Sequence, residues 1–128
     1  YPEWQTYTDD HLSSFFELDT YFYSSFYTNN LFPEAIKFTN AYRKWYSKDM
    51  ANTFPKYGML GFDTAFFFLK GLHKYGSNFE ENMNQMMLTP IQTGFKFERV
   101  NNWGGFINRK VFLVNFTKNF ELIKLDFE

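Results

Sequence analysis

The sequence contains no cysteine, which excludes a disulfide framework and thiol chemistry. It also lacks a surplus of charge of either sign, because 13 Lys and Arg residues stand against 14 Asp and Glu residues. Nucleic-acid-binding domains usually carry a basic surplus, and disordered tails usually carry blocks of like charge. No apolar run reaches the roughly 20 residues needed to cross a bilayer. We therefore predict no nucleic-acid partner and no membrane span.

A catalytic or metal-binding constellation is also missing. His11 and His73 are the only histidines, and neither has a second histidine at ligand spacing. His11 follows Asp9 and Asp10, a pattern typical of a solvated helix start, and His73 falls near a helix end, where the dipole favours a cation. The paired serines lack the flanking glycines of a nucleophile elbow. We predict no enzymatic activity, no metal and no cofactor.

Aromatic side chains are abundant instead. They make up 24% of the chain, and 19 of the residues are Phe, so the core is predicted to be built from rings. A length of 128 residues corresponds to one domain or to part of a larger one. The chain begins at Tyr1 without an initiator Met, and we interpret it as a piece of a longer protein.

Residues 54–76 form the stretch around which the rest of the chain is expected to be arranged. Apolar residues recur there at helical spacing, and a second apolar row leaves little polar face. Pro55 suits the first turn of a helix, and Gly76 suits the position just after its end. The stretch therefore predicts one central helix.

A helix that is apolar nearly all round belongs in an interior. A second, amphipathic helix is predicted over 31–47. We expect Phe62, Phe66 and Leu69 of the central helix to be nearly fully buried between this second helix and a sheet. The apolar stripe expected on the second helix consists of Leu31, Ala35, Phe38, Tyr42 and Trp45.

Shorter elements are predicted on either side of these two helices. They are a short helix from Thr8, a strand at 19–27, a short helix from Ser77, a strand at 95–99, and a hairpin of strands 111–116 and 121–127. This order favours an α/β layered domain with a β-rich C-terminal end. The aromatic strand 19–27 is open to two interpretations. Ordinary β packing is favoured, and lining of a ligand cleft is the alternative.

Several short motifs carry a family resemblance. The run Pro2-Glu3-Trp4, a helix, the strand 19–27 and a helix ending at Ala41-Tyr42 resemble the later part of type I periplasmic substrate-binding proteins, which include the leucine/isoleucine/valine-binding group. The run Gly61-Phe62-Asp63-Thr64-Ala65 resembles the family's Gly-Tyr-Asp-Ala helix start, with Phe62 in place of the usual Tyr. Gly94-Phe95-Lys96-Phe97, the turn at Gly104-Gly105 and the strand 111–116 resemble its closing strands.

The chain is also similar to a Bacteroidetes branch of envelope proteins, in which such a region often follows peptidoglycan-binding LysM repeats. The resemblance implies a partial type I periplasmic-binding-protein fold, with residues 1–128 as its C-terminal portion. It implies two α/β lobes around a ligand cleft, without chemistry. The central helix would pack in one lobe, and the strand 19–27 would pair in the other.

The function that the resemblance implies is non-enzymatic binding of a small amino-acid- or peptide-like ligand in the periplasm or cell envelope. Glu3 falls where amino-acid binders of the family place a carboxylate for the ligand ammonium. Trp4, Ser24, Ser25 and Tyr27 fall near strand ends that would face the cleft. The alternative is a structural or assembly domain of the envelope that has lost its ligand, with peptidoglycan association through a domain outside this chain.

The resemblance leaves the first half of the fold outside this chain. A fragment of a two-lobed fold exposes apolar surface and sheet edges, and both favour pairing between chains. We therefore predict that the isolated chain self-associates.

Overall fold

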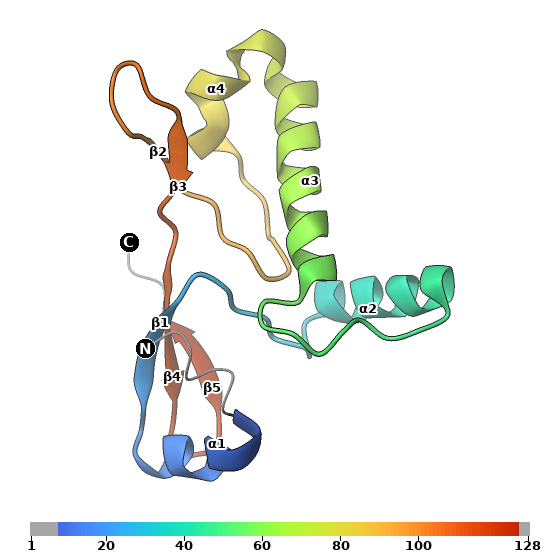
Figure 1. Ribbon diagram of the computed structural model, residues 1–128, viewed down its shortest axis with the longest axis vertical. Helices are drawn as coiled ribbons and strands as arrows, with labels where there is room; N and C mark the ends of the chain where they lie inside the picture. The colour runs from blue at the N-terminus through green and yellow to red at the C-terminus, as the bar shows by residue number, and fades with distance from the viewer. Residues whose placement is uncertain (1–7, 126–128) are drawn as a thin grey trace. The chain divides into compact units, whose positions relative to one another are not determined.

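The computed structural model of the protein describes residues 8–125 (Figure 1). The chain forms two compact units. The described residues of the first unit are 8–27 and 111–125, and the second unit is the continuous stretch Thr28–Lys110. Helices and small antiparallel sheets occur together in the described residues, so the predicted mixed α/β character is confirmed.

The first unit packs one helix on a three-stranded antiparallel sheet. Its elements are α1 (Thr8–Glu17), β1 (Tyr21–Ser24), β4 (Phe112–Phe116) and β5 (Leu122–Leu125). The strand order is β1-β4-β5, with Phe22 opposite Val114 and Asn115 opposite Ile123. The β4–β5 pair is the hairpin expected over 111–127, although β5 as described ends at Leu125.

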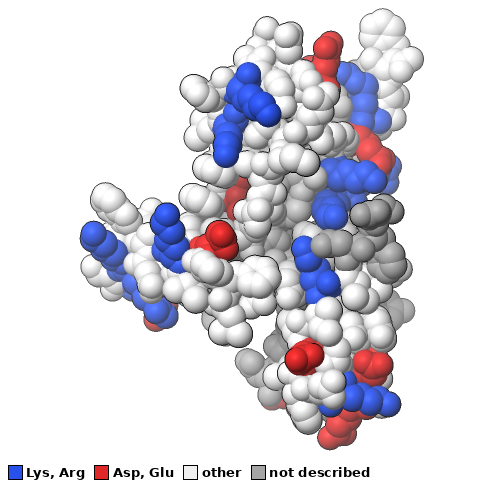
Figure 2. All heavy atoms as spheres, turned by 180° about the vertical axis from the view of Figure 1, so that it is seen from behind, with Lys and Arg blue, Asp and Glu red and all other residues white. Residues whose placement is uncertain are grey.

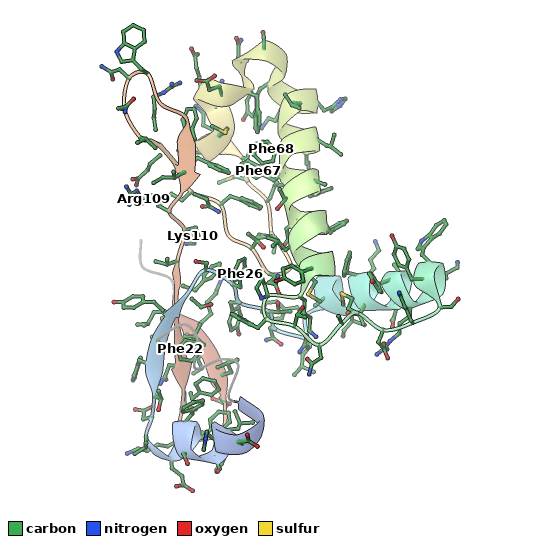
Figure 3. All side chains as sticks on the ribbon, in the orientation of Figure 1. Phe22, Phe26, Phe67, Phe68, Arg109 and Lys110 are labelled. Carbon is green, nitrogen blue, oxygen red and sulfur yellow. The ribbon has the colours of Figure 1, made fainter. Side chains whose placement is uncertain are left out.

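The core of the first unit is made of rings, as the composition indicates. Phe22, Phe112, Val114 and Phe116 are buried together. α1 contributes Phe15 and Phe16, whose ring centroids lie 5.5 and 5.1 Å from that of Phe116. Figure 3 shows Phe22 on the ribbon of β1 in this unit. Tilted and edge-on ring pairs of this kind add to the burial of apolar area.

The predicted strand 19–27 is too long at both ends. Asp19 has a positive φ of 52° and its carboxylate accepts a hydrogen bond from buried Asn115 at 3.0 Å, so the chain turns there before β1 begins. At the other end, the Ser24 hydroxyl bonds the backbone of Phe26 and ends the strand in a turn. Polar side chains that bond the local backbone compete with strand pairing, which explains the shorter element.

The second unit contains two longer helices and a small hairpin. Its elements are α2 (Pro33–Tyr46), α3 (Tyr57–Tyr75), η2 (Gly76–Asn78), α4 (Phe79–Asn82), η3 (Met83–Gln85), β2 (Phe97–Arg99) and β3 (Phe106–Asn108). β2 and β3 pair antiparallel, with Glu98 opposite Ile107. The buried cluster is Phe67, Phe79 and Met83, and partly buried rings of Phe95, Phe97 and Phe106 pack against it.

The central helix is confirmed as α3, but its first turn begins after Pro55. Lys56 is extended, with φ −74° and ψ 107°, because its backbone is held by Gln92. The Lys56 N–H donates to Gln92 Oε1 at 3.0 Å, and Gln92 Nε2 donates to the Lys56 carbonyl at 3.2 Å. Gly76 ends the helix as predicted, at a φ of 55° that glycine adopts without strain.

The expected burial of Phe62, Phe66 and Leu69 is wrong. These side chains are 41%, 45% and 68% exposed. α3 instead buries a face made of Met59, Asp63, Phe67 and Gly71. Because the helix is apolar nearly all round, its sequence pattern does not distinguish the covered side from the others. The stripe expected on α2 is also wrong in part, since Ala35 is buried whereas Leu31 and Trp45 are more than 80% exposed.

Gly71 is required by the packing of α3 on α4. A Cβ at this position would lie 2.0 Å from Cε2 of Phe79, which is itself buried. We expect Gly71→Ala to destabilise the protein by about 1–3 kcal/mol, because overpacking outweighs the gain in helix propensity. The measurement is equilibrium urea denaturation.

The matched control for Gly71→Ala is Gly61→Ala in the same helix. Nothing lies within 4 Å of a Cβ built at Gly61. Without a clash, alanine should stabilise the helix by up to about 1 kcal/mol through propensity. If both substitutions changed the free energy of unfolding in the same direction and by the same amount, the packing described for Gly71 would be contradicted.

Candidate functional site

Of the five ligand-binding residues predicted from the sequence, Ser24, Ser25 and Tyr27 lie in the first unit. Glu3 and Trp4 are outside the described residues. Ser24 is 2% exposed, and its hydroxyl donates to the Phe26 carbonyl at 2.7 Å and accepts from the Phe26 N–H at 3.1 Å. Its side chain therefore stabilises the turn after β1 and faces the interior rather than solvent.

Ser25 and Tyr27 follow this turn. Ser25 is exposed, whereas Tyr27 is partly buried against Phe112, with the two ring centroids 6.4 Å apart. The Tyr27 hydroxyl donates to the Leu122 carbonyl at 3.4 Å, and burial raises the pKa of this hydroxyl above 10.0. Ser24, Ser25 and Tyr27 thus have three different environments, and their contact with a ligand stays a prediction.

Because of Tyr27, the free energy of unfolding of the first unit is expected to fall at alkaline pH. Its raised pKa means that the unfolded state releases the proton at a lower pH than the folded state. The stabilising contribution is fully present below the unfolded pKa of 10.0 and is lost as the pH rises through the folded pKa. Tyr27→Phe should therefore reduce the loss of stability above about pH 10.

This pH dependence is measured by urea denaturation at several pH values on either side of the unfolded tyrosine pKa. The control is Tyr21→Phe, since Tyr21 lies in the same unit and is 53% exposed. Identical alkaline profiles for Tyr27→Phe and the wild type would argue against burial of the Tyr27 hydroxyl.

A second candidate site is an open groove within the second unit. It has a volume of about 630 Å³ and lies between the end of α3, the short helix α4 and the β2–β3 hairpin. This volume falls in the range of small-molecule sites. Figure 3 shows Phe67 and Phe68 projecting from α3 on the side where α4 lies. The apolar side chains that line the groove are Phe68, Leu72, Phe79, Met83, Trp103 and Phe106.

One ion pair stands at the rim of this groove. The Arg99 guanidinium donates to the Glu80 carboxylate and, at 3.2 Å, to the Gly104 carbonyl. It also lies 4.5 Å from the centroid of the Phe106 ring. The Arg99 and Glu80 side chains are 41% and 57% exposed, so the pair contributes at most about 1 kcal/mol to stability. Its effect is to tie the hairpin loop to α4.

The hairpin loop 100–105 presents Trp103, whose side chain is 98% exposed. The loop is held by its own backbone: Val100 N–H donates to the Gly105 carbonyl at 3.0 Å, and Gly104 N–H donates to the Asn101 carbonyl at 3.2 Å. The Asn101 side chain accepts from the Trp103 N–H at 3.0 Å. The exposed Trp103 indole therefore projects from a turn that these hydrogen bonds hold in place.

Asp63 is the buried carboxylate of the second unit, and its role is structural. It is 3% exposed and accepts three backbone hydrogen bonds, from Ile91 at 2.8 Å, Gln92 at 2.8 Å and Thr93 at 2.9 Å. A buried carboxylate with this number of N–H donors is well satisfied and anchors the segment to α3. This anchor was not predicted from the sequence, although an acidic residue within an apolar helix is a signal of such a role.

The remaining charged groups do not form a further site in the described residues. Within residues 8–125, no group of three or more His, Asp or Glu side chains is placed to hold a metal ion. His11 and His73 are both exposed. On the face drawn in Figure 2, acidic and basic side chains are interspersed and not collected by sign. In this part of the chain no helix has the length and apolarity to span a membrane.

Comparison with known proteins returned no relative. No protein-family model, no curated protein and no solved structure matches this chain. The function therefore has to be inferred from the residues and from the geometry of the two units.

Proposed function

We propose that this chain is a non-enzymatic binding domain built like the C-terminal portion of a type I periplasmic substrate-binding protein. Its ligand is a small amino-acid- or peptide-like molecule, and its place of action is the periplasm or cell envelope. The proposal extends the family resemblance of the short motifs around Glu3, Asp63 and Gly104.

The observation that carries this proposal is the division of the chain. The chain leaves the first unit after Tyr27 and returns to it after Lys110. The strand β1 and the helix α3 consequently belong to different units, each with its own buried aromatic cluster. A chain that contributes part of each of two lobes is expected to be divided in this way, with separate cores.

One observation favours a second function, a structural domain of the envelope without a ligand. Ser24 is buried and engaged with the backbone of Phe26, so one of the five predicted ligand residues is occupied within the fold. Asp63, in the motif that resembles the family's helix start, is likewise occupied by the backbone of 91–93. Motif residues with structural roles are compatible with a fold that has lost its ligand.

Calorimetric titration of the full-length protein separates the two functions. Amino acids and short cell-wall peptides are titrated into the wild type and into Glu3→Gln. Loss of a charge-assisted hydrogen bond costs about 1.5–3 kcal/mol, so the variant should bind about tenfold more weakly or worse. The matched control is Glu17→Gln, an exposed carboxylate on α1, which should bind like the wild type.

Three outcomes of this titration have different meanings. Weaker binding by Glu3→Gln alone supports the ligand site. Equal binding by both variants and the wild type removes Glu3 from that site. Absence of binding by the wild type overturns the ligand function and favours the structural domain.

A further inference from the structure

A row of aromatic rings crosses the surface of the second unit from α2 to α3. The rings of Tyr46, Tyr42, Phe38, Phe62 and Phe66 follow one another, with successive centroids 4.6, 6.3, 5.0 and 5.6 Å apart. None of the five is buried, and Tyr46 is 62% exposed. The surface that α2 and α3 form around this row is termed the aromatic helix face. Contiguous exposed rings of this kind mark an interaction surface.

Projecting side chains extend this apolar surface beyond the rings. Leu31 precedes α2 and is 82% exposed, Trp45 near the end of α2 is 81% exposed, and Leu69 on α3 is 68% exposed. Leu69 stands three residues after Phe66, so the two side chains lie on one side of α3. In Figure 1 the C-terminal end of α2 projects away from α3. Side chains that project in this way fit a broad surface better than a small molecule, which is usually enclosed.

Cations outnumber anions in the second unit, although the two kinds are interspersed. Residues 28–110 contain 11 Lys and Arg against six Asp and Glu, whereas the remaining residues contain two against eight. Four of the six acidic side chains are already engaged. Asp63 is buried against backbone N–H groups, and Asp49, Glu80 and Glu98 each pair with an arginine. The unit therefore presents a surplus of positive charge to a partner.

The lysines of α2 and α3 supply the unpaired part of this surplus. Lys70 lies beside the row, with its ammonium 5.2 Å from the centroid of the Phe66 ring. Lys44 precedes Trp45, and Lys48 follows Tyr46 by two residues. The lysines of this region that are exposed and form no ion pair with a described residue are Lys37, Lys44, Lys48, Lys70 and Lys74.

Exposed apolar rings flanked by lysines match the chemistry of an anionic bilayer surface. Trp and Tyr side chains prefer the boundary between the acyl chains and the headgroups. Lysine side chains extend along apolar surface and place their ammonium groups at the phosphates. Helices that lie on membranes combine such an apolar side with flanking cations, and anionic lipid strengthens their binding.

A single-stranded nucleic acid is the other anionic partner that binds aromatic side chains, because its bases stack on them. Two observations favour lipid. Leu31 and Leu69 are exposed aliphatic side chains, which offer no ring for stacking. At three of the four contacts along the row, moreover, the rings are tilted by 41° to 49°, so the row does not form parallel platforms.

We propose that the aromatic helix face binds the surface of a bilayer that contains anionic lipid. The rings and leucines enter the interfacial layer, and the lysines contact the lipid phosphates. The proposal is independent of the ligand proposed above, because this face lies wholly within Thr28–Lys110 and includes none of the five predicted ligand residues.

The first test is flotation of the full-length protein with two kinds of vesicle, phosphatidylcholine alone and phosphatidylcholine mixed equally with phosphatidylglycerol. The wild type should bind the mixed vesicles much more strongly, and added salt should weaken this binding because it screens the lysines. K44Q/K48Q should bind about tenfold more weakly or worse, since each cation near an anionic surface accounts for about fivefold.

The matched control for K44Q/K48Q is K96Q/K118Q. It removes the same total charge at two exposed lysines outside α2 and α3. This control should bind the mixed vesicles like the wild type, because exposed charges separated by more than the screening length act weakly on one another.

The second test compares two tryptophan variants on the mixed vesicles. Trp45→Ser should weaken binding at least fivefold, because it removes a projecting ring from the aromatic helix face. Trp103→Ser should bind like the wild type, since Trp103 is 98% exposed but lies on the β2–β3 loop of the same unit. Circular dichroism of all variants checks that they remain folded.

Any of four results would overturn the proposal. They are a wild type that does not bind the mixed vesicles, equal weakening by the two lysine pairs, equal weakening by the two tryptophan variants, and binding of oligothymidylate in place of vesicles. The last result would assign the face to single-stranded nucleic acid. Each result leaves the calorimetric titration of Glu3→Gln unaffected, so the two proposals fail separately.

Discussion

Phe67→Ala is expected to lower the free energy of unfolding by about 3–5 kcal/mol, the range found for large aromatic truncations in cores. Phe67 is 2% exposed, and its ring centroid lies 4.4 Å from that of Phe95 and 5.4 Å from that of Phe97. The Phe79 ring is 5.9 Å away. Removing Phe67 therefore leaves a cavity at the centre of the cluster that holds α3, α4 and the hairpin together.

The neighbouring substitution Phe66→Ala provides the control. Phe66 is 45% exposed, stacks on Phe62 with centroids 5.6 Å apart, and lies under the Lys70 ammonium at 5.2 Å. Because only part of its area is buried, its truncation should cost about 1 kcal/mol. The burial of Phe66 expected from the sequence would instead give a large loss for Phe66→Ala, so urea denaturation of the two variants decides which face of α3 is covered. A larger loss for Phe66→Ala would reverse the assignment.

Asp63→Ala should cost about 3 kcal/mol or more. Three backbone N–H groups, at Ile91, Gln92 and Thr93, would lose their common acceptor. Each buried donor left unpaired costs about 1–3 kcal/mol, and the three losses are not independent. Asp63→Asn keeps the shape but turns an N–H donor toward these donors, so it should also destabilise, by about 2 kcal/mol.

The exposed carboxylate of Asp49 is the control for Asp63. It pairs with Arg43 at the surface, with its side chain 70% exposed, and Asp49→Asn should cost less than about 1 kcal/mol. Hydrogen exchange gives a local readout, because the amides of 91–93 should exchange faster in Asp63→Asn than in the wild type. Unchanged exchange at these amides would show that Asp63 does not anchor the segment.

Local signals in the sequence determined the existence and type of the main elements. Apolar residues at helical spacing and the terminating Gly76 predicted α3, and the period-two pattern around a polar turn predicted the hairpin of β4 and β5. These features depend on neighbours within a few residues, so they can be inferred without knowledge of the rest of the chain. The mixed α/β character follows from them.

The tertiary structure decided which sides of these elements are covered. The buried face of α3 includes Asp63 and Gly71, which a hydrophobicity pattern assigns to the surface. The burial of Asp63 is tolerated because its carboxylate accepts hydrogen bonds from three backbone N–H groups of 91–93. Gly71 is found on this face because the Phe79 ring occupies the space that a Cβ would need. Both reasons involve segments that are distant in the sequence, which a local pattern does not encode.

The same limit applies to the candidate sites. The family resemblance indicated Ser24 and Tyr27 as residues facing a cleft, but the alternation along β1 and its pairing with β4 place the Ser24 side chain in the interior. The open groove of the second unit was not predicted, because it forms only when α3, α4 and the loop at Trp103 are brought together. Propensity acts between near neighbours, whereas burial and grooves are properties of contacts between segments that are far apart in the chain.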